Sequence, residues 1–75
     1  MSIDLLISQI EEEFDEVPKG TITALTSFRE IDGWSSMHAL ILIALIDNHY
    51  DILLTGTELK NAQTIQDIFD IIKSK

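Results

Sequence analysis

The residues with the most distinctive chemistry lie in one stretch, Asp32-Gly33-Trp34-Ser35-Ser36-Met37, between a long polar segment and an apolar run. A helix that begins at Ser35 or Ser36 would place a serine hydroxyl beside the unpaired backbone N–H groups of its first turn. Those N–H groups and the helix dipole favour negative charge, so they would stabilise a phosphodiester on a serine hydroxyl. On these residues alone, a serine that only caps the helix is the more common arrangement.

The rest of the sequence offers poor candidates for catalysis, because it has two histidines and no cysteine. His38 and His49 are separated by three turns of one expected helix, roughly 16 Å, which is too far to share a metal ion. We interpret both as surface residues. The sequence also lacks a glycine-rich phosphate loop, a nucleophile elbow and a paired metal-ligand motif. We therefore expect no enzyme; a catalytic function would need residues from another chain.

Length and charge narrow the possible partners. A chain of 75 residues with 45% hydrophobic residues allows one small domain with one core. Its net charge of −8 repels phosphate backbones and attracts basic protein surfaces. We therefore expect an electropositive protein partner, no nucleic acid ligand and a monomeric state.

No segment resembles a membrane span or a secretory signal. The longest apolar run, Ala39 to Ile46, is far shorter than the roughly 20 residues that a spanning helix needs. The N-terminal residues lack the basic start and the cleavage site of a signal peptide. The expected location is the cytoplasm, and the absence of cysteine is compatible with a reducing compartment.

The first segment predicts an amphipathic helix, which Pro18-Lys19-Gly20 should end. From Thr21 to Ser35 no regular period continues, and so long a connection is usually functional or disordered. We interpret it as functional. Two sets of apolar residues should attach these segments to the core: Ile3, Leu6, Ile7, Ile10, Phe14 and Val17 in the helix, and Ile22, Leu25, Phe28 and Ile31 in the loop.

The second helix should run from Ser35 or Ser36 to about Tyr50. Taking 100° per residue, one arc without charges should face the core, and the opposite arc leaves apolar groups toward water or a partner. A buried strand through Ala39 to Ile46 is the alternative, disfavoured because no partner strand is visible. The inner arc comprises Ala39, Leu42, Ile43, Ile46 and Tyr50, and the outer arc Met37, Ile41 and Ala44 beside Asn48.

The C-terminal part predicts a short turn or helix near Thr57 to Asn61 and a last helix that ends near Lys73. Thr64-Ile65-Gln66-Asp67 has the pattern of a capped helix start. The expected fold is therefore all-α. Its predicted buried residues are Ile3, Leu6, Ile10, Phe14, Phe28, Leu42, Ile43, Ile46, Ile65, Ile68, Phe69 and Ile72.

The stretch Gly33-Trp34-Ser35-Ser36-Met37 resembles the start of the second helix in acyl carrier proteins, where a glycine and a variable residue precede Asp-Ser-Leu. Tyr50-Asp51-Ile52-Leu53, a short helix around Glu58-Leu59, and Thr64-Ile65 extend the resemblance over nearly the whole chain. No single one of these motifs is very specific, but their order, the length and the acidity agree.

The resemblance implies a four-helix carrier-protein bundle, three longer helices plus one short helix, forming a single acyl carrier domain over residues 1–75. By the same resemblance, Ser36 would carry a covalent phosphopantetheine arm, attached by a phosphopantetheinyl transferase. Acyl- or aminoacyl-loading and transferring enzymes would use the arm's thioester, and a small groove between helices would shelter the acyl chain. The expected docking residues are Trp34, Met37, His38, Ile41, Ala44 and Asp47.

Two departures from the family pattern matter. Ser35 replaces the usual aspartate, so a capping hydroxyl remains while a charge that the family presents to its transferase is lost. We therefore expect modification to require a dedicated transferase. His38 and Ile41 stand where the family often has carboxylates, which favours docking by apolar contact. Trp34 either packs against the loop or stands exposed at the base of the arm.

A second function stays open: an unmodified small helical interaction module. It would use Met37, Ile41 and Ala44 as its binding surface. The mass of the protein after exposure to a transferase separates this hypothesis from the carrier hypothesis. The sequence does not identify the carried group or the pathway.

Overall fold

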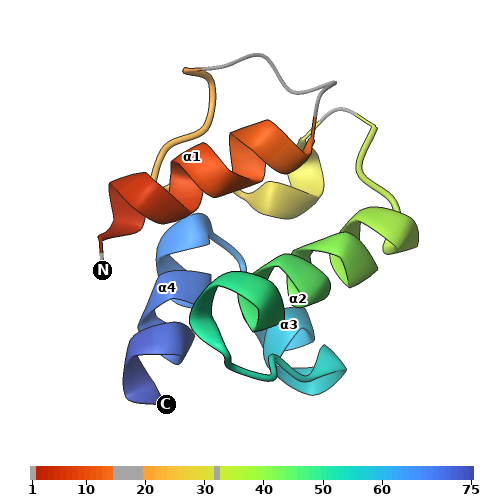
Figure 1. The fold of residues 1–75 in the computed structure, drawn as a ribbon. Coiled ribbons are helices and arrows are strands. Elements are labelled where there is room, and N and C mark those ends of the chain that lie inside the picture. Colours follow the sequence, from red (N-terminus) through yellow and green to blue (C-terminus); the bar gives the residue numbers. More distant parts are fainter. Residues whose placement is uncertain (1, 15–19, 32) are drawn as a thin grey trace.

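The computed structural model describes residues 2–14, 20–31 and 33–75. Over these residues the chain forms three longer helices and one short one, which confirms the predicted all-α fold (Figure 1). The only β pairing described in these ranges is an isolated bridge between Ser27 and Thr64, so the alternative of a buried strand through residues 39–46 is wrong. The elements are α1 (Ile3–Glu13), the 3-10 turn η1 (Phe28–Glu30), α2 (Ser36–Tyr50), α3 (Gly56–Asn61) and α4 (Ile65–Ser74).

The core forms where α1 packs against α2 and α4 (Figure 1). Ten of the twelve residues predicted to be buried are buried, whereas Ile3 and Ile43 lie at its edge and are partly buried. Helical periodicity did not predict the burial of Leu45 in α2. It also did not predict the buried residues in the α2–α3 connection, in α3 and just after α3. The core residues absent from the predicted set are Ile22, Leu45, Leu54, Leu59 and Ala62.

Helix α1 is shorter than the apolar pattern indicates. It ends at Glu13, and the N–H of Phe14 donates to the carbonyl of Ile10 as the cap. Phe14 itself is buried, as predicted. Val17 and the predicted stop at Pro18 and Lys19 lie outside the described residues.

The long connection is held against the start of α4. The N–H of Gln66 donates to the carbonyl of Ala24 at 2.9 Å, and the N–H of Ile65 donates to that of Thr26 at 3.2 Å. Ile22 and Phe28 are buried and Ile31 is partly buried, which confirms three of the four predicted attachments.

The fourth prediction, Leu25, is wrong because its side chain is 80% exposed. Thr26 N–H donates to Thr23 carbonyl, which closes a turn with Leu25 at its tip. The hydroxyl of Thr26 further accepts a bond from Thr23 N–H at 2.8 Å. A side chain at the tip of such a turn points to solvent whatever its hydropathy.

Helices α3 and α4 both begin with complete capping boxes. Thr55 and Glu58 form the first, and Thr64 and Asp67 the second, each pair exchanging side-chain bonds with the backbone N–H of the other. The second box is the one that the sequence predicts. These boxes fix the residues at which the two helices start.

Candidate functional site

The start of α2 holds the two serines singled out by the sequence. Ser35 is the N-cap residue in extended backbone, and Ser36 is the first helical residue with an exposed side chain. Gly33, two residues earlier, has a φ of +82°, a left-handed conformation that favours glycine. This glycine turn leads the chain from the loop into the helix.

The predicted capping bond of Ser35 is not formed. Its side chain makes no bond to a backbone N–H of the first turn. Instead its Oγ lies 2.9 Å from Nδ1 of His38, one turn further along. The Ser35 hydroxyl is therefore hydrogen-bonded to the imidazole of His38 and not, as predicted from the sequence, to a backbone N–H.

Beneath this turn lies an aromatic cluster of Trp34, His38, Phe14 and Phe28. Trp34 packs edge-on against Phe14 and Phe28, with ring centroids 5.9 and 5.4 Å apart. The His38 ring lies 5.2 Å from that of Phe14 and 5.6 Å from that of Trp34. Trp34 therefore packs against the loop. His38 is partly exposed, because its ring also packs in this cluster, whereas His49 is exposed as predicted.

The outer face of α2 differs in one position from the predicted outer arc. Met37 and Leu40 are each 67% exposed, and Ala44 and Asp47 are exposed beside them. Ile41 is partly buried against the core, so its predicted exposure is wrong. The reason is Leu45: its burial extends the core arc around the helix, and Ile41 lies on the flank of that arc.

A pocket of about 400 Å³ opens between α2, η1 and α3, with Ser36 at its edge. Most of its lining is apolar, and its two cations, Arg29 and Lys60, come from η1 and α3. The lining residues are Phe28, Arg29, Trp34, Ser36, Ala39, Leu40, Ile43, Gly56, Leu59 and Lys60. An apolar pocket beside an exposed hydroxyl can shelter an apolar group that is tethered to that hydroxyl.

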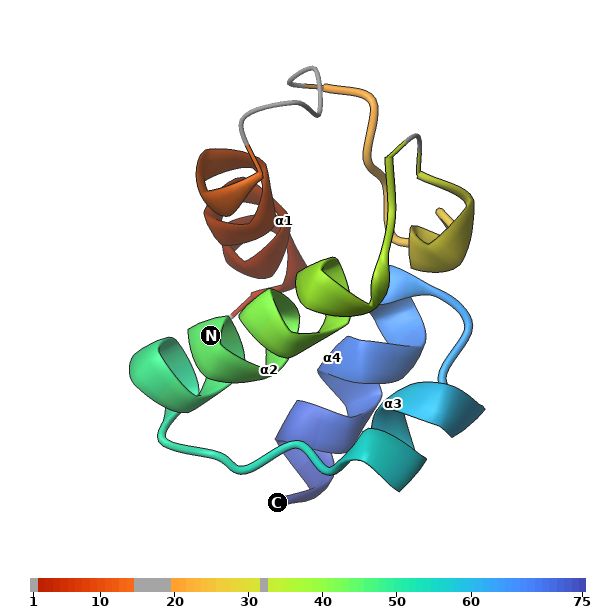
Figure 2. The same cartoon turned by 90° about the vertical axis from the view of Figure 1, so that its right-hand side faces the viewer.

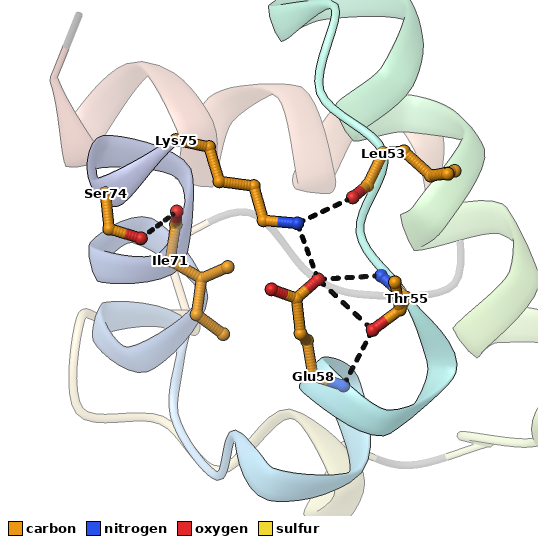
Figure 3. Close-up of polar contacts among 6 residues, drawn as sticks. All are labelled: Leu53, Thr55, Glu58, Ile71, Ser74 and Lys75. Atoms are coloured by element: carbon orange, nitrogen blue, oxygen red, sulfur yellow. Dashed lines mark hydrogen bonds and ion pairs between the residues drawn. The ribbon is translucent and has the colours of Figure 1, made fainter.

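The last residue of the chain joins α4 to the start of α3 (Figure 3). Lys75 Nζ donates to the Leu53 carbonyl at 3.0 Å and to Glu58 Oε1 at 2.8 Å. The same Glu58 oxygen accepts from Thr55 N–H at 3.0 Å. The bond from Lys75, followed by that from the Thr55 backbone, lowers the pKa of Glu58. Glu58 thus remains ionised to a lower pH than a free glutamate.

At the start of α4, Asp67 accepts two backbone bonds. The N–H of Gln63 donates to its carboxylate at 3.0 Å and that of Thr64 at 3.1 Å. These bonds, that from Gln63 first, lower the pKa of Asp67. At the other end of α2, burial raises the pKa of Tyr50, whose hydroxyl donates to Gln9 Oε1 at 2.7 Å.

The described residues contain neither a membrane-spanning helix nor a metal-binding cluster. No helix in residues 2–14, 20–31 and 33–75 is long and apolar enough to cross a membrane. The same residues contain no group of three or more histidine or acidic side chains arranged to hold a metal ion.

The chain matches no protein-family model and no curated protein. Among solved structures it is similar to the solution NMR structure of a holo acyl carrier protein from Geobacter metallireducens, with a TM-score of 0.81 and 29% sequence identity. The match covers 97% of this chain and 83% of that one. The chain has the fold of an acyl carrier protein.

In this carrier-protein fold, the predicted site residues divide into two groups. Trp34, Ser36, Met37 and His38 come together around the first turn of α2, while Ala44 and Asp47 continue its exposed face toward the other end. Sequence reasoning missed Leu40, although at 100° per residue it shares the face of Met37 and Ala44. It also missed Arg29 and Lys60, for which no sequence pattern gave a signal.

Proposed function

We propose that residues 1–75 form a single acyl carrier domain that presents an acyl or aminoacyl thioester on a phosphopantetheine arm at Ser36. One observation carries the proposal: in a fold similar to that of a holo acyl carrier protein, an exposed serine begins α2 at the edge of an apolar pocket. The arm's thiol would hold the cargo, and the chain itself would not catalyse a reaction.

Ser36 is favoured over its neighbour by the surroundings of the two hydroxyls. Ser36 lines the pocket, whereas the Ser35 hydroxyl is hydrogen-bonded to the ring of His38. In the attachment step the Ser36 oxygen would form a bond to the phosphorus of the pantetheine phosphate of coenzyme A. The pyrophosphate bond would break, adenosine bisphosphate would leave, and the serine proton would pass to the transferase. Ser36 is therefore the nucleophile, and the contribution of this chain to the attachment step is an accessible Ser36 hydroxyl.

The surroundings of Ser36 also suit the charge that attachment adds. The first turn of α2 contains no acidic residue, and the Ser35 side chain bonds none of its N–H groups. A phosphodiester at this end of a helix gains from the dipole and from the N–H groups. The helix start thus tolerates the new negative charge without rearrangement.

The exposed face next to Ser36 supports docking of partner enzymes. Met37, Leu40 and Ala44 are apolar and exposed, and Asp47 adds a negative charge to the same face. A partner with an apolar centre and a basic rim would complement it. Trp34, His38 and Ile41 support this face from beneath, since they pack inward.

We place this activity in the cytoplasm, on a monomer that meets a phosphopantetheinyl transferase and the enzymes that load and use the arm. The net charge of −8 favours basic protein surfaces over nucleic acid. The pathway and the identity of the acyl group follow from the mass of the thioester-bound group on protein isolated from its native cell.

The test is the intact mass of the purified chain after incubation with coenzyme A and a broad-specificity phosphopantetheinyl transferase. The proposal expects one added phosphopantetheine group, located at Ser36 by fragmentation of the modified peptide. If several transferases, including one from the native cell, leave the mass unchanged, the chain is an unmodified interaction module. The exposed Met37 and Leu40 are what that second function would use.

A further inference from the structure

Helix α3 forms one wall of the pocket, through Gly56, Leu59 and Lys60. It has six residues, and so short a helix is unstable without outside support. In the described part of the chain the closely packed helix pairs are α1 with α2 and α1 with α4, and α3 belongs to neither. Its position therefore depends on the burial of Leu59 in the core and on the side chains that fasten its two ends.

Arg29 of η1 fastens the C-terminal end. Its Nη1 donates to the Ala62 carbonyl at 2.7 Å, and its Nη2 donates to the carbonyls of Leu59 and Lys60 at 2.6 and 2.8 Å. The last carbonyls of a helix have no partner within it and carry partial negative charge. One guanidinium satisfies three of them, which a planar fork of donors can do and a single ammonium cannot.

The guanidinium is itself held in place. Its central carbon lies 4.8 Å from the centroid of the Phe28 ring, and Phe28 is buried. Figure 2 shows η1 beside the connection from α3 to α4, so the arginine spans two segments far apart in sequence. Phe28 and Arg29 both line the pocket. This fastening therefore joins two walls of the same cavity.

The fastening at the other end of α3 is different. The capping box of Thr55 and Glu58 and the bonds of Lys75 hold the N-terminal end, and none of these three residues lines the pocket. Loss of that fastening would loosen the start of α3, where Gly56 lines the pocket. Loss of the Arg29 bonds would instead release the other end of α3, where Leu59 and Lys60 line the pocket.

We propose that Arg29 is a positioning residue that holds α3 closed against η1 and thereby limits the size of the acyl group that the pocket accepts. The part that concerns acyl groups rests on the proposed carrier function; the part that concerns α3 does not. Without the guanidinium, the carbonyls of Lys60 and Ala62 would turn to water, that of Leu59 would keep its bond from the Ala62 N–H, and α3 would more often populate an open position. Longer chains would then be sheltered as well as short ones.

The first experiment measures amide hydrogen exchange in the full-length, unmodified protein. Arg29→Met keeps the apolar stem and removes all donors, so α3 amides should exchange about tenfold faster or more, as expected for loss of charged hydrogen bonds, while the protected amides of α1 stay near parent rates. Arg29→Lys keeps the positive charge but lacks the planar set of guanidinium donors, so it should also speed amide exchange in α3. Lys73→Met is the matched control, because Lys73 lies over the Phe69 ring and outside the pocket lining.

Unchanged α3 exchange in both Arg29 variants would overturn the proposal. Equal acceleration in every helix would do so too, because it would show a general loss of stability instead of a local opening. Arg29→Lys keeps the test valid if Arg29→Met does not fold. This experiment needs no phosphopantetheine, so its result is independent of whether Ser36 is modified.

The second experiment uses holo protein loaded with butyryl, octanoyl or palmitoyl groups and measures the rise in melting temperature that each group produces. The parent should gain most from a group that fills the closed pocket, and Arg29→Met should shift the maximum toward longer chains. The same chain-length profile in both proteins would overturn the specificity role. A chain that takes up no arm would instead contradict the carrier function and leave the exchange result standing.

Discussion

The start of α2 and the starts of α3 and α4 solve the same problem in different ways. Each of α3 and α4 has a threonine and an acid in a complete capping box, so side chains of the protein bond the first N–H groups. Helix α2 begins with Ser35, whose hydroxyl is hydrogen-bonded to His38, and its first turn has no acid. The two capped ends serve stability, while the uncapped end keeps its electrostatic attraction for an anion.

This difference in capping distinguishes three helix starts that have similar N-cap residues, Ser35, Thr55 and Thr64. A serine or threonine precedes each of the three helices, and only the structure shows which hydroxyls bond the backbone. The uncapped helix is also the one that borders the pocket with an exposed serine. The following predictions test the contrast between the start of α2 and the starts of α3 and α4.

The largest effect is expected at the two adjacent serines. Ser36→Ala should abolish phosphopantetheine attachment and leave the fold intact, because the Ser36 side chain is exposed and bonds no core residue. Ser35→Ala is the matched control and should still be modified. Intact mass after transferase treatment and a far-ultraviolet circular dichroism spectrum decide the result. Attachment to Ser35 in the Ser36→Ala variant would show that the motif is misassigned by one residue.

The next effect concerns the exposed face of α2. Met37→Glu and Leu40→Glu should each weaken binding to the cognate loading enzyme about tenfold or more, since each places a charge in an apolar contact. Leu53→Glu is the control, because Leu53 is 69% exposed and lies outside α2. Titrations of the purified partner at low and high salt measure both the affinity and its electrostatic part. Equal affinities in all three variants would assign docking to another surface.

Ile41 sharpens the same test. The sequence places it with Met37 and Ala44, but it is partly buried against the core. Ile41→Glu should therefore lower the stability of the protein as well as its binding, whereas Met37→Glu, at a 67% exposed side chain outside the pocket lining, should affect binding alone. A melting curve of each variant distinguishes the two effects.

A smaller effect separates the capped starts from the uncapped one. Thr55→Ala and Thr64→Ala should each reduce the free energy of unfolding by about 1 kcal/mol, the usual cost of losing a capping side chain. Ser35→Ala should cost less, because its hydroxyl bonds no backbone N–H of the first turn. Urea denaturation of the three variants at one pH compares them directly. A larger cost for Ser35→Ala than for Thr64→Ala would remove the contrast.

The sequence predicted the fold well because helical periodicity and stop signals are local. It placed α2 from Ser35 or Ser36 to about Tyr50, in agreement with the observed Ser36–Tyr50, and recognised the start of α4 from Thr64 and Asp67. It also predicted the position of Ser36 at the first turn of α2. These features depend on residues within a few positions of one another, which is the range over which a pattern is informative.

What the sequence missed depends on contacts between distant segments. Arg29 bonds carbonyls some thirty positions away, and no local pattern indicates such a partner. The Ser35 hydroxyl has two possible hydrogen-bond partners within one turn, a backbone N–H and the His38 ring. No sequence pattern indicates which of the two bonds is the more stable. Leu45 is buried and extends the buried arc of α2, a helix that packs against α1, which lies far from it in sequence.

The smallest expected effect is a dependence of the free energy of unfolding on pH in the acidic range. Glu58 and Asp67 have pKa values lowered below their ordinary 4.5 and 3.8, because the folded protein donates hydrogen bonds to their ionised forms. A group with a lowered folded pKa contributes stability that is complete above its ordinary pKa and is lost as the pH falls through that value toward the folded one. The starts of α3 and α4 should therefore weaken in that acidic range. The start of α2 should not, because its first turn has no carboxylate.

Urea denaturation over this pH range measures the effect, with Glu58→Gln and Asp67→Asn as the comparison variants. Each variant should lose part of the stability at neutral pH and show a flatter dependence below the ordinary pKa, so that its curve approaches that of the parent in acid. Both residues are partly exposed, so screening by salt should reduce the contribution of the Lys75 bond to Glu58 more than that of the backbone bonds to Asp67. Parallel curves for parent and variants would show that the capping carboxylates have the same pKa in the folded and unfolded chain, and that the contrast between the helix starts is geometric only.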